Sequence, residues 1–438
     1  MKKLLWLILA GLLAGAPADA ATLHRKEVVL FGAAKFKPKL DLKFTAALPQ
    51  VVNYTRAGSR SCFSSAGLLV TLSANTPCLD YNPTTLNAAG LLIEESRTNL
   101  LIQSQFASGW TGGNASITQA AAVGPDGVGG SAIKLVEAAT TSQHLMSKVT
   151  TGTITAGQTV VVGAFLKSAE RTSAWVLATD AGFANGFRIN VNSTACSIIG
   201  STAFGTGTLV ANSATVTTLP NGWCWATVAG TVDPATTTTP QAAVYLNSGT
   251  SYLGDGTSGM FVYGADLQLG GFRTSYIATT AATVTRAGDL ATLALTAFAF
   301  NPNAVTYVTE GDVGALTVVD AYLVGASATV AYPAPLVQGG SFKVVGALPG
   351  INYTAATNFV PTIGVVFKAA YAAKVGDHSI TANGALPAIS TLANAFVSPA
   401  ALALGSNNSS QFLNGHLKRF RDFNSRLPDS RLPLLTSP

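Results

Sequence analysis

Short segments in which apolar and polar residues alternate run through the whole chain, and most of them end at a turn-forming sequence. Residues 188–192 (Arg-Ile-Asn-Val-Asn) alternate strictly, while residues 159–167 and 260–269 are longer apolar runs. Strict alternation is typical of a β-strand with one solvated face, and short apolar runs are typical of strands inside a core. Turn sequences such as Gly-Pro-Asp-Gly at residues 124–127 separate them. The pattern predicts an all-β protein of antiparallel strands.

The composition agrees with this prediction and limits the classes of function. Small and β-branched residues dominate, and the 43 glycines favour strands and turns over helices. A length of 438 residues is enough for two or three domains. The net charge of +6 is weak for a nucleic-acid-binding protein, so no nucleic-acid partner is expected. Only 11% of the residues are charged, which fits a protein in an assembly or outside a cell, and equally a β-sandwich that simply has few charges.

The first 20 residues have the pattern of a secretory signal peptide. Residues 1–3 (Met-Lys-Lys) are basic, residues 4–13 are apolar, and Ala-Asp-Ala at 18–20 fits cleavage before Ala21. The apolar run is too short to span a membrane, and no other segment has about 18 apolar residues without a break. We therefore expect export, with no membrane span once the signal peptide is removed.

Four cysteines are present, and an exported protein could join them in two disulfides. Four cysteines allow three pairings. We expect Cys62–Cys78 across a hairpin and Cys196–Cys224 on neighbouring strands. No CxxC spacing occurs, so a zinc site is not expected. Four buried thiols are the alternative if the chain stays in the cytoplasm.

Residues 54–101 carry a resemblance to a known group of proteins. The motifs are Tyr-Thr-Arg-Ala at 54–57, Pro-Cys-Leu-Asp-Tyr at 77–81 and Gly-Leu-Leu-Ile-Glu-Glu-Ser-Arg-Thr-Asn-Leu-Leu at 90–101. They resemble the N-terminal module of tailed-phage and prophage virion surface proteins of the tail-fibre or head-spike type. Cys62 and Cys78 depart from that pattern, which usually has an aromatic residue and an arginine there. The resemblance implies a small module that attaches the protein to other virion proteins.

Two later parts of the chain resemble the β-sandwiches that follow this module in the same group. Trp110, Asn-Gly-Trp at 221–223 and residues 265–277 resemble marks of jelly-roll carbohydrate-binding modules. The last strands of residues 404–432 resemble the end of a concanavalin-like or laminin-G-like sandwich. The expected fold is two antiparallel β-sandwiches behind a small N-terminal β-module. The expected domains are 1–20 (signal peptide), 21–100 (attachment module), 101–283 (jelly roll) and 284–438 (concanavalin/laminin-G-like sandwich).

The sequence lacks the patterns that familiar enzyme classes need. The four histidines are not in ligand spacing, and neither a GxSxG nucleophile turn nor a nucleotide-binding glycine loop is found. A glycosidase needs two carboxylates across the scissile bond. The nearest arrangement is Glu310 with Asp312, which lacks a further glutamate. Asp255 and Asp266 could ligate Ca²⁺, but a plain turn is favoured. We predict no enzyme, no cofactor and no metal.

Binding is favoured over catalysis. Proteins hold sugars by stacking an apolar sugar face on an aromatic ring and fixing the hydroxyls with polar side chains. The candidate stacking residues in the expected jelly roll are Trp175, Phe187 and Tyr252. The candidate polar partners are Asn185, Arg188 and Asn190. Each aromatic candidate could instead belong to the core.

The sequence therefore predicts a non-enzymatic virion surface protein of a phage or prophage that binds host-surface glycans. A secreted bacterial carbohydrate-binding protein or adhesin is the first alternative, which the signal peptide favours, and a glycan hydrolase is the second. The expected location is the virion surface or the extracellular space. A homo-oligomer stays open, because fibres often form trimers but the chain shows no heptad repeat.

Overall fold

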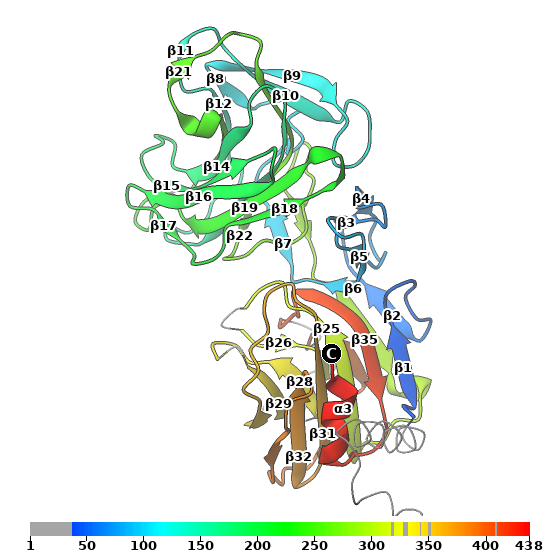
Figure 1. Ribbon diagram of the computed structural model, residues 1–438. Coiled ribbons are helices and arrows are strands. Elements are labelled where there is room, and N and C mark those ends of the chain that lie inside the picture. Colours follow the sequence, from blue (N-terminus) through cyan, green and yellow to red (C-terminus); the bar gives the residue numbers. More distant parts are fainter. Residues whose placement is uncertain (1–36, 317–318, 327–331, 342, 349–351, 408–409) are drawn as a thin grey trace, which may run out of the picture.

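The computed structural model describes residues 37–316, 319–326, 332–341, 343–348, 352–407 and 410–438, and almost all of its regular structure is β-strand (Figure 1). The strands form two β-sandwiches, which lie one above the other in Figure 1. The described residues include one short α-helix, α3 (Leu432–Thr436). The predicted all-β class and the antiparallel sandwiches are confirmed. The expected signal peptide lies outside the described residues.

The first sandwich has two sheets around one core. We call them the outer sheet and the junction sheet. The outer sheet has the order β16 (Ser197–Phe204), β15 (Gly186–Asn192), β14 (Ser173–Thr179), β20 (Gln241–Leu246), β12 (Leu145–Val149) and β8 (Thr111–Gly113). The junction sheet has the order β17 (Thr208–Leu209), β19 (Cys224–Thr231), β13 (Val160–Ser168), β22 (Gly259–Leu269), β10 (Ala132–Glu137) and β9 (Ala115–Ala122). In addition, β18 (Thr215–Thr218) pairs with β19, β7 (Arg97–Asn99) pairs with β22, and β23 (Val284–Arg286) pairs with β7. A separate pair is formed by β11 (Thr141–Ser142) and β21 (Tyr252–Leu253).

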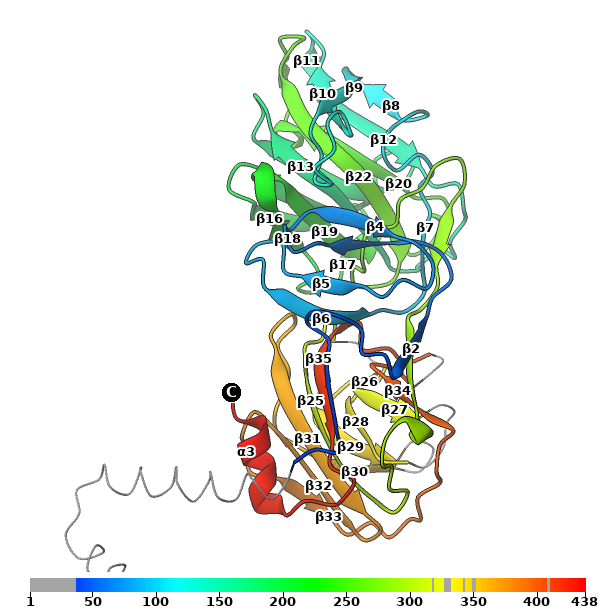
Figure 2. The same ribbon diagram turned by 90° about the vertical axis from the view of Figure 1, so that its right-hand side faces the viewer.

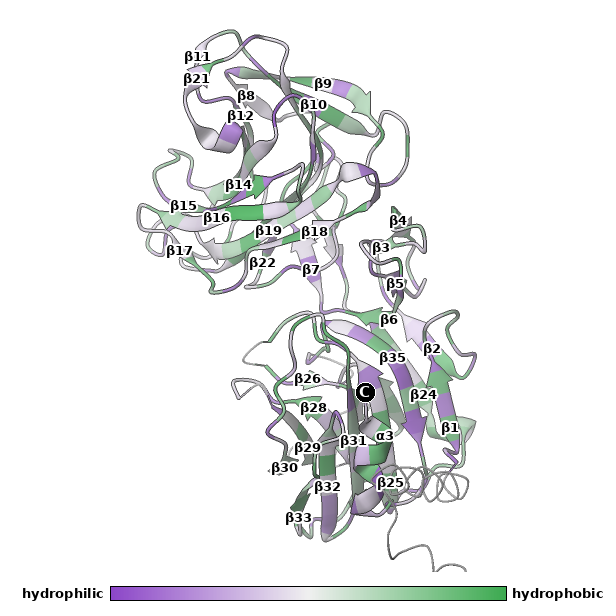
Figure 3. Cartoon of the chain, viewed as in Figure 1, coloured by the Kyte–Doolittle hydropathy of each residue, from purple (hydrophilic) through white to green (hydrophobic). Residues whose placement is uncertain are grey.

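Strand alternation explains how this core forms. Val160, Val162 and Leu166 of β13 point into the core and are at most 1% exposed. Phe165 lies between them in sequence and faces the opposite side of the junction sheet, where it packs in a second apolar cluster. Successive side chains of a strand point to opposite faces, so one strand serves both clusters. Figure 3 shows green and purple segments alternating along many strands.

The second sandwich packs one large sheet against two small ones around a common core. The large sheet has the order β33 (Ala388–Ser390), β32 (Asp377–Ala382), β31 (Phe367–Lys374), β25 (Ala304–Gly311), β35 (Gly415–Asp422), β6 (Ala88–Ile93) and β5 (Leu79–Tyr81), with β1 (Leu40–Lys43) also on β35. One small sheet has the order β2 (Val52–Thr55), β24 (Leu290–Ala294), β34 (Ala401–Leu404) and β27 (Val324–Ala326). The other has the order β26 (Ala321–Tyr322), β28 (Ala334–Val337), β29 (Val344–Leu348) and β30 (Asn352–Ala356).

Strands from the start of the chain complete the second sandwich. Both β1 and β6 pair with β35, and β2 pairs with β24. These pairings use backbone N–H and C=O groups that an open sheet edge would leave unpaired. Residues 21–100 were expected as a separate module, but β1, β2, β5 and β6 of this range belong to the sheets of the C-terminal sandwich. The first sandwich is inserted between β6 and β24, and β7 pairs with β23 where the chain enters and leaves it.

A disulfide-bonded hairpin lies between the two sandwiches. It consists of β3 (Arg60–Phe63) and β4 (Leu69–Leu72), and Figure 2 shows β4 and β5 between the upper and lower bodies. Cys62 of β3 is joined to Cys78, and Cys196 is joined to Cys224 at the edge of the first sandwich. The structure thus contains both disulfides that the sequence predicts. Within the described residues, none of the helices has the length and apolar character needed to cross a membrane.

Candidate functional site

The two external faces of the first sandwich differ in what packs against them. The external face of the junction sheet is covered by the hairpin, because Phe63 and Leu69 pack against Phe165, Trp223 and Trp225. The apolar cluster on the external face of the outer sheet consists of residues of that sheet alone. The outer sheet therefore presents the more accessible face for a ligand.

Cross-strand register brings side chains of five strands together on this external face. In one row, Tyr245 of β20 lies opposite both Leu145 of β12 and Trp175 of β14. The same row continues to Asn190 of β15. In the next row, Leu177 lies opposite Ala243 and Arg188. We call the following residues the platform: Leu145, Trp175, Leu177, Arg188, Phe204, Ala243 and Tyr245.

Trp175 is fixed in the platform by two neighbours. The guanidinium carbon of Arg188 lies 3.7 Å from the centroid of its ring. Gly249 lies against the ring as well, since a Cβ at that position would fall 2.1 Å from two ring carbons. Gly249 follows Ser248, whose hydroxyl donates a hydrogen bond of 2.8 Å to Oδ1 of Asn190. These contacts cover much of the ring and leave Trp175 half-buried, so it supports the surface more than it offers a free face.

Arg188 is a cation without a counter-ion. It stacks on Trp175 and lies 5.4 Å from the ring centroid of Phe204. Among the residues that the structure describes, no hydrogen bond or ion pair reaches its guanidinium group. Burial lowers the pKa of Arg188, but arginine keeps its charge in proteins. Its side chain therefore carries a positive charge at the surface of the platform.

A polar hollow adjoins the platform on the same sheet. Its volume is about 350 Å³. Gln241, opposite Val149 on β12 and Thr179 on β14, brings a side-chain amide to it. The residues that line the hollow are Gly109, Thr111, Ser147, Lys148, Val149, Thr151 and Gln241. Together the platform and the hollow form an apolar area bordered by amides, hydroxyls and a lysine.

Of the six binding residues predicted from the sequence, the structure places three on the platform face and three elsewhere. It brings Trp175, Arg188 and Asn190 together on the platform face. Phe187 must be corrected: it is 0% exposed and belongs to the core. Its neighbour Arg188 faces outward, and adjacent residues of a strand cannot share a face.

Two other predicted residues are engaged elsewhere. The amide nitrogen of Asn185 donates to Asp180 at 2.7 Å within the loop between β14 and β15. Tyr252 lies on β21, where its hydroxyl donates to Glu137 at 2.6 Å and Arg171 lies 5.0 Å from its ring centroid. Neither residue is a member of the platform.

Sequence reasoning missed three aromatic residues at this face. Tyr245 and Phe204 are members of the platform, and Phe183 contacts Tyr245 with 6.2 Å between ring centroids. Phe183 is 37% exposed, which makes it the most accessible ring here. The pairing of β14 with β20 would have identified Tyr245, because it places Tyr245 opposite Trp175.

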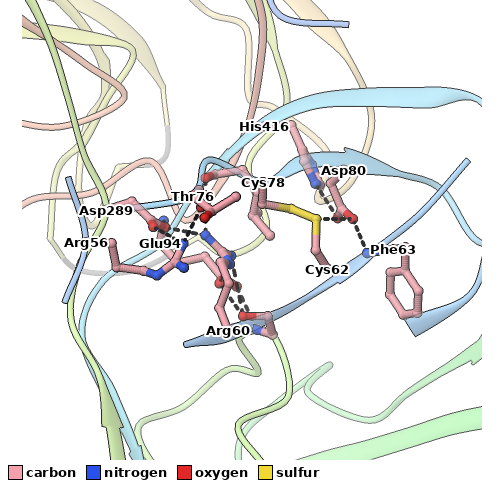
Figure 4. Close-up of a disulfide and its surroundings, with 12 residues drawn as sticks. Arg56, Arg60, Cys62, Phe63, Thr76, Cys78, Asp80, Glu94, Asp289 and His416 are labelled. Carbon is pink, nitrogen blue, oxygen red and sulfur yellow. Dashed lines mark hydrogen bonds and ion pairs between the residues drawn. A yellow bond between two sulfur atoms is a disulfide. The ribbon is translucent and has the colours of Figure 1, made fainter. Parts of the chain in front are cut away.

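Three carboxylates that the sequence offered for catalysis or calcium binding accept hydrogen bonds from other groups of the protein. Both carboxylate oxygens of Asp312 lie 3.0 Å from Nδ1 of His416, and Nε2 of His416 lies 3.1 Å from Oδ2 of Asp80 (Figure 4). Burial lowers the pKa of His416, but Asp312 and Asp80 outweigh it and raise this pKa to about 10. Asp255 accepts hydrogen bonds within its own turn, whereas Asp266 lies on β22 and accepts one from Gln268.

Comparisons with known proteins show similarity to solved β-sandwich structures only. No protein-family model and no curated protein matches the chain. A Ruminococcus gnavus IT-sialidase CBM40 bound to α2,6-sialyllactose is 15% identical, with 31% of this chain and 85% of that chain covered and a TM-score of 0.26. Domains LG4-5 of the mouse laminin α1 chain are 9% identical, with 76% and 90% covered and a TM-score of 0.22. The LG1-3 region of the laminin α2 chain is 10% identical, with 66% of each chain covered and a TM-score of 0.16. Similarity at this level supports no conclusion on function.

Proposed function

We propose that the protein is a non-enzymatic glycan-binding protein and that the platform of the first sandwich is its binding surface. The observation that carries this proposal is the arrangement on the outer sheet: fixed aromatic side chains lie on an external face whose apolar cluster contains residues of that sheet alone. Aromatic rings beside amides and hydroxyls suit a ligand with apolar faces and many hydroxyl groups.

The accessible parts of the platform suggest how a sugar would lie on it. Phe183, which contacts Tyr245 at the border of the platform, offers an exposed ring, and Ser147 and Gln241 lie beside the platform as well. A sugar ring on Phe183 would place its hydroxyl groups toward these polar side chains. Trp175 would hold Arg188 in position beneath the ligand.

A glycan array with the full-length protein tests the proposal, with Phe183→Ala as the decisive variant. Because Phe183 is exposed, its removal should leave thermal stability unchanged, and we expect it to weaken binding about fivefold. Leu253→Ala is the matched control, since Leu253 is 71% exposed on β21 and lies outside the platform. The proposal fails if the array shows no binding, or if both variants bind as strongly as the wild type.

Two locations are proposed for a protein with this binding function: the surface of a virion, or the outside of a bacterial cell after export. The motifs at residues 54–101 favour a virion surface protein attached through this segment, while both disulfides favour an exported protein, since disulfides persist in oxidising compartments. N-terminal sequencing separates them. Intact Met1 in purified particles supports the virion protein, and a start at Ala21 in the periplasm or the medium supports a secreted adhesin.

The absence of enzymatic activity is part of the proposal and has its own test. Asp312 is held by His416, and Glu310 lies opposite Arg419 on the neighbouring strand. Incubation with host polysaccharide should release no reducing ends. Release that disappears in Glu310→Gln or Asp312→Asn would show a hydrolase instead.

A further inference from the structure

Arg188 has no acidic partner in the described structure, in contrast to Arg171 and Arg419. In the same sandwich, Arg171 forms a bidentate pair with Glu137, with distances of 2.7 and 2.6 Å. In the second sandwich, Arg419 forms a similar pair with Asp41. The contacts of Arg188 are instead the rings of Trp175 and Phe204. The hydrogen-bond donors of its guanidinium group are therefore free for a ligand.

The guanidinium group of Arg188 is also held in a defined orientation. Trp175 stacks on it at 3.7 Å, and Gly249 keeps Trp175 in place from the adjoining turn. Gly249 has a φ of +63°, and any larger residue would collide with the ring. A planar guanidinium that is already ordered loses little conformational freedom when it binds an anion.

The surroundings of Arg188 do not neutralise its charge. Asn190 and Ser248 are neutral, and the ammonium group of Lys148, which lines the hollow, donates to the carbonyl of Gly109 at 2.8 Å. The carboxylate of Asp180, in the loop after β14, accepts hydrogen bonds from the backbone N–H of Ala184 and the side chain of Asn185. The platform therefore presents a net positive charge to a ligand.

We propose that the glycan bound by the platform is acidic and that its carboxylate forms a bidentate pair with Arg188. This inference rests on the proposed glycan-binding function of the platform. The guanidinium fork matches the geometry of a carboxylate, and charge-assisted hydrogen bonds of this kind are stronger than those between neutral groups. A neutral sugar would leave the charge of Arg188 uncompensated under the ligand.

Binding of paired saccharides to the full-length protein tests this inference. Each pair differs only in its carboxyl groups: oligogalacturonate, hyaluronan oligosaccharides and sialyllactose are each compared with their carboxyl-reduced form. We expect at least one acidic member to bind about tenfold or more tightly than its neutral partner. Arg188→Gln should reduce this preference to about twofold or less, because the donor fork and its charge are both removed.

Two further variants show whether the effect belongs to the guanidinium group. Arg188→Lys keeps the charge and loses the planar fork, so its preference should lie between those of the wild type and Arg188→Gln. Lys134→Gln is the control, because Lys134 lies on the junction sheet and pairs with Glu170 at 2.8 Å. It removes one positive charge from the same sandwich and should leave the preference unchanged. Thermal unfolding of each variant verifies that it is folded.

The outcomes separate this inference from the proposed function. Equal binding of acidic and neutral members by the wild type overturns the inference and leaves the glycan-binding function standing. A preference that survives in both Arg188 variants also overturns it. Absence of binding by every member of the panel overturns both. A preference that Arg188→Gln removes while Lys134→Gln keeps it supports the inference.

Discussion

Replacement of Glu94 by glutamine tests the buried charge network that joins the two sandwiches. Glu94 follows β6, and its carboxylate is 7% exposed. It pairs with Arg60 of the hairpin (Figure 4), and it lies 3.1 Å from Nη1 of Arg286 in β23. It also accepts hydrogen bonds of 2.7 Å from the N–H and the hydroxyl of Ser275, which follows β22. One carboxylate thus connects the hairpin, the second sandwich and two segments of the first.

The size of the effect follows from the pKa of Glu94. Burial raises this pKa, but Arg286, Arg60 and the hydrogen bonds from Ser275 outweigh burial and lower it from 4.5 to about 2. A shift of this size corresponds to about 3 kcal/mol of stability at neutral pH. A lowered carboxyl pKa stabilises the fold above pH 4.5, and this stability is lost as the pH falls toward 2. Glu94→Gln should therefore lower the free energy of unfolding by about 3 kcal/mol at pH 7 and by about 1 kcal/mol at pH 3.

Urea unfolding of the oxidised full-length chain at both pH values measures this difference, and Glu95→Gln is the matched control. Glu95 is the next residue, but its side chain is 31% exposed and pairs with Arg97 at 2.7 Å. Because water still reaches the carboxylate of Glu95, we expect its replacement to cost less, about 1 kcal/mol. The reasoning is refuted if Glu94→Gln costs no more than Glu95→Gln, or if its cost at pH 3 equals its cost at pH 7.

Three further predictions concern the same junction. Replacing Cys62 and Cys78 by serine removes a link across 16 residues and should lower the free energy of unfolding by about 3 kcal/mol in a denaturant titration. Burial raises the pKa of Asp266 to about 7, so its ionisation destabilises the fold as the pH rises from 4 to 8. Asp266→Asn should match the wild type in thermal unfolding near pH 4 and exceed it at pH 8; equal melting temperatures at pH 8 contradict this. The pKa of His416, raised to about 10, makes its charged form stabilising below pH 6.5, and this stability is lost as the pH passes 10. His416→Gln should cost about 3 kcal/mol at pH 6 and much less near pH 10.5, and a cost that is independent of pH contradicts the ion pair.

The features that the sequence predicted well are those that short segments determine. The alternation along residues 188–192 corresponds to β15, and the apolar run at residues 260–269 corresponds to β22. The pairing of Cys62 with Cys78 depends on nearby strands around one hairpin, so local turn chemistry was enough to anticipate it. Each of these features is set within about 30 residues, where hydrophobic period and turn residues are informative.

The insertion of one sandwich into the other could not be predicted in this way. Leu42 of β1 lies opposite Phe420, and Val52 of β2 lies opposite Leu293. Such pairs join strands that are more than 200 residues apart, and a strand of four residues carries too little information to specify a distant partner. Strand propensity describes a fit to a half-buried surface, and the surface exists only after the chain has folded.

The members of the platform were predicted in part, and the alternation of side chains along a strand explains why. Arg188 and Asn190 share one face of β15, and Phe187 must lie on the other. The alternation alone would have excluded a site with both Phe187 and Arg188. Tyr245 escaped notice because β20 becomes a neighbour of β14 only through pairing between distant segments.

Each external face of the first sandwich carries an arginine that is stacked on a tryptophan. On the junction sheet, Arg273 lies over Trp225 at 4.3 Å, which repeats the stacking of Arg188 on Trp175. Burial lowers the pKa of Arg273 to about 10, and the carboxylate of Glu94 opposes this effect. At the junction, the chain itself therefore supplies negative charge near a stacked arginine. No carboxylate of the described residues pairs with the stacked arginine of the platform, so the balancing charge there has to come from solvent ions or from a bound partner. An acidic saccharide would supply that charge and contact the neighbouring aromatic side chains at the same time.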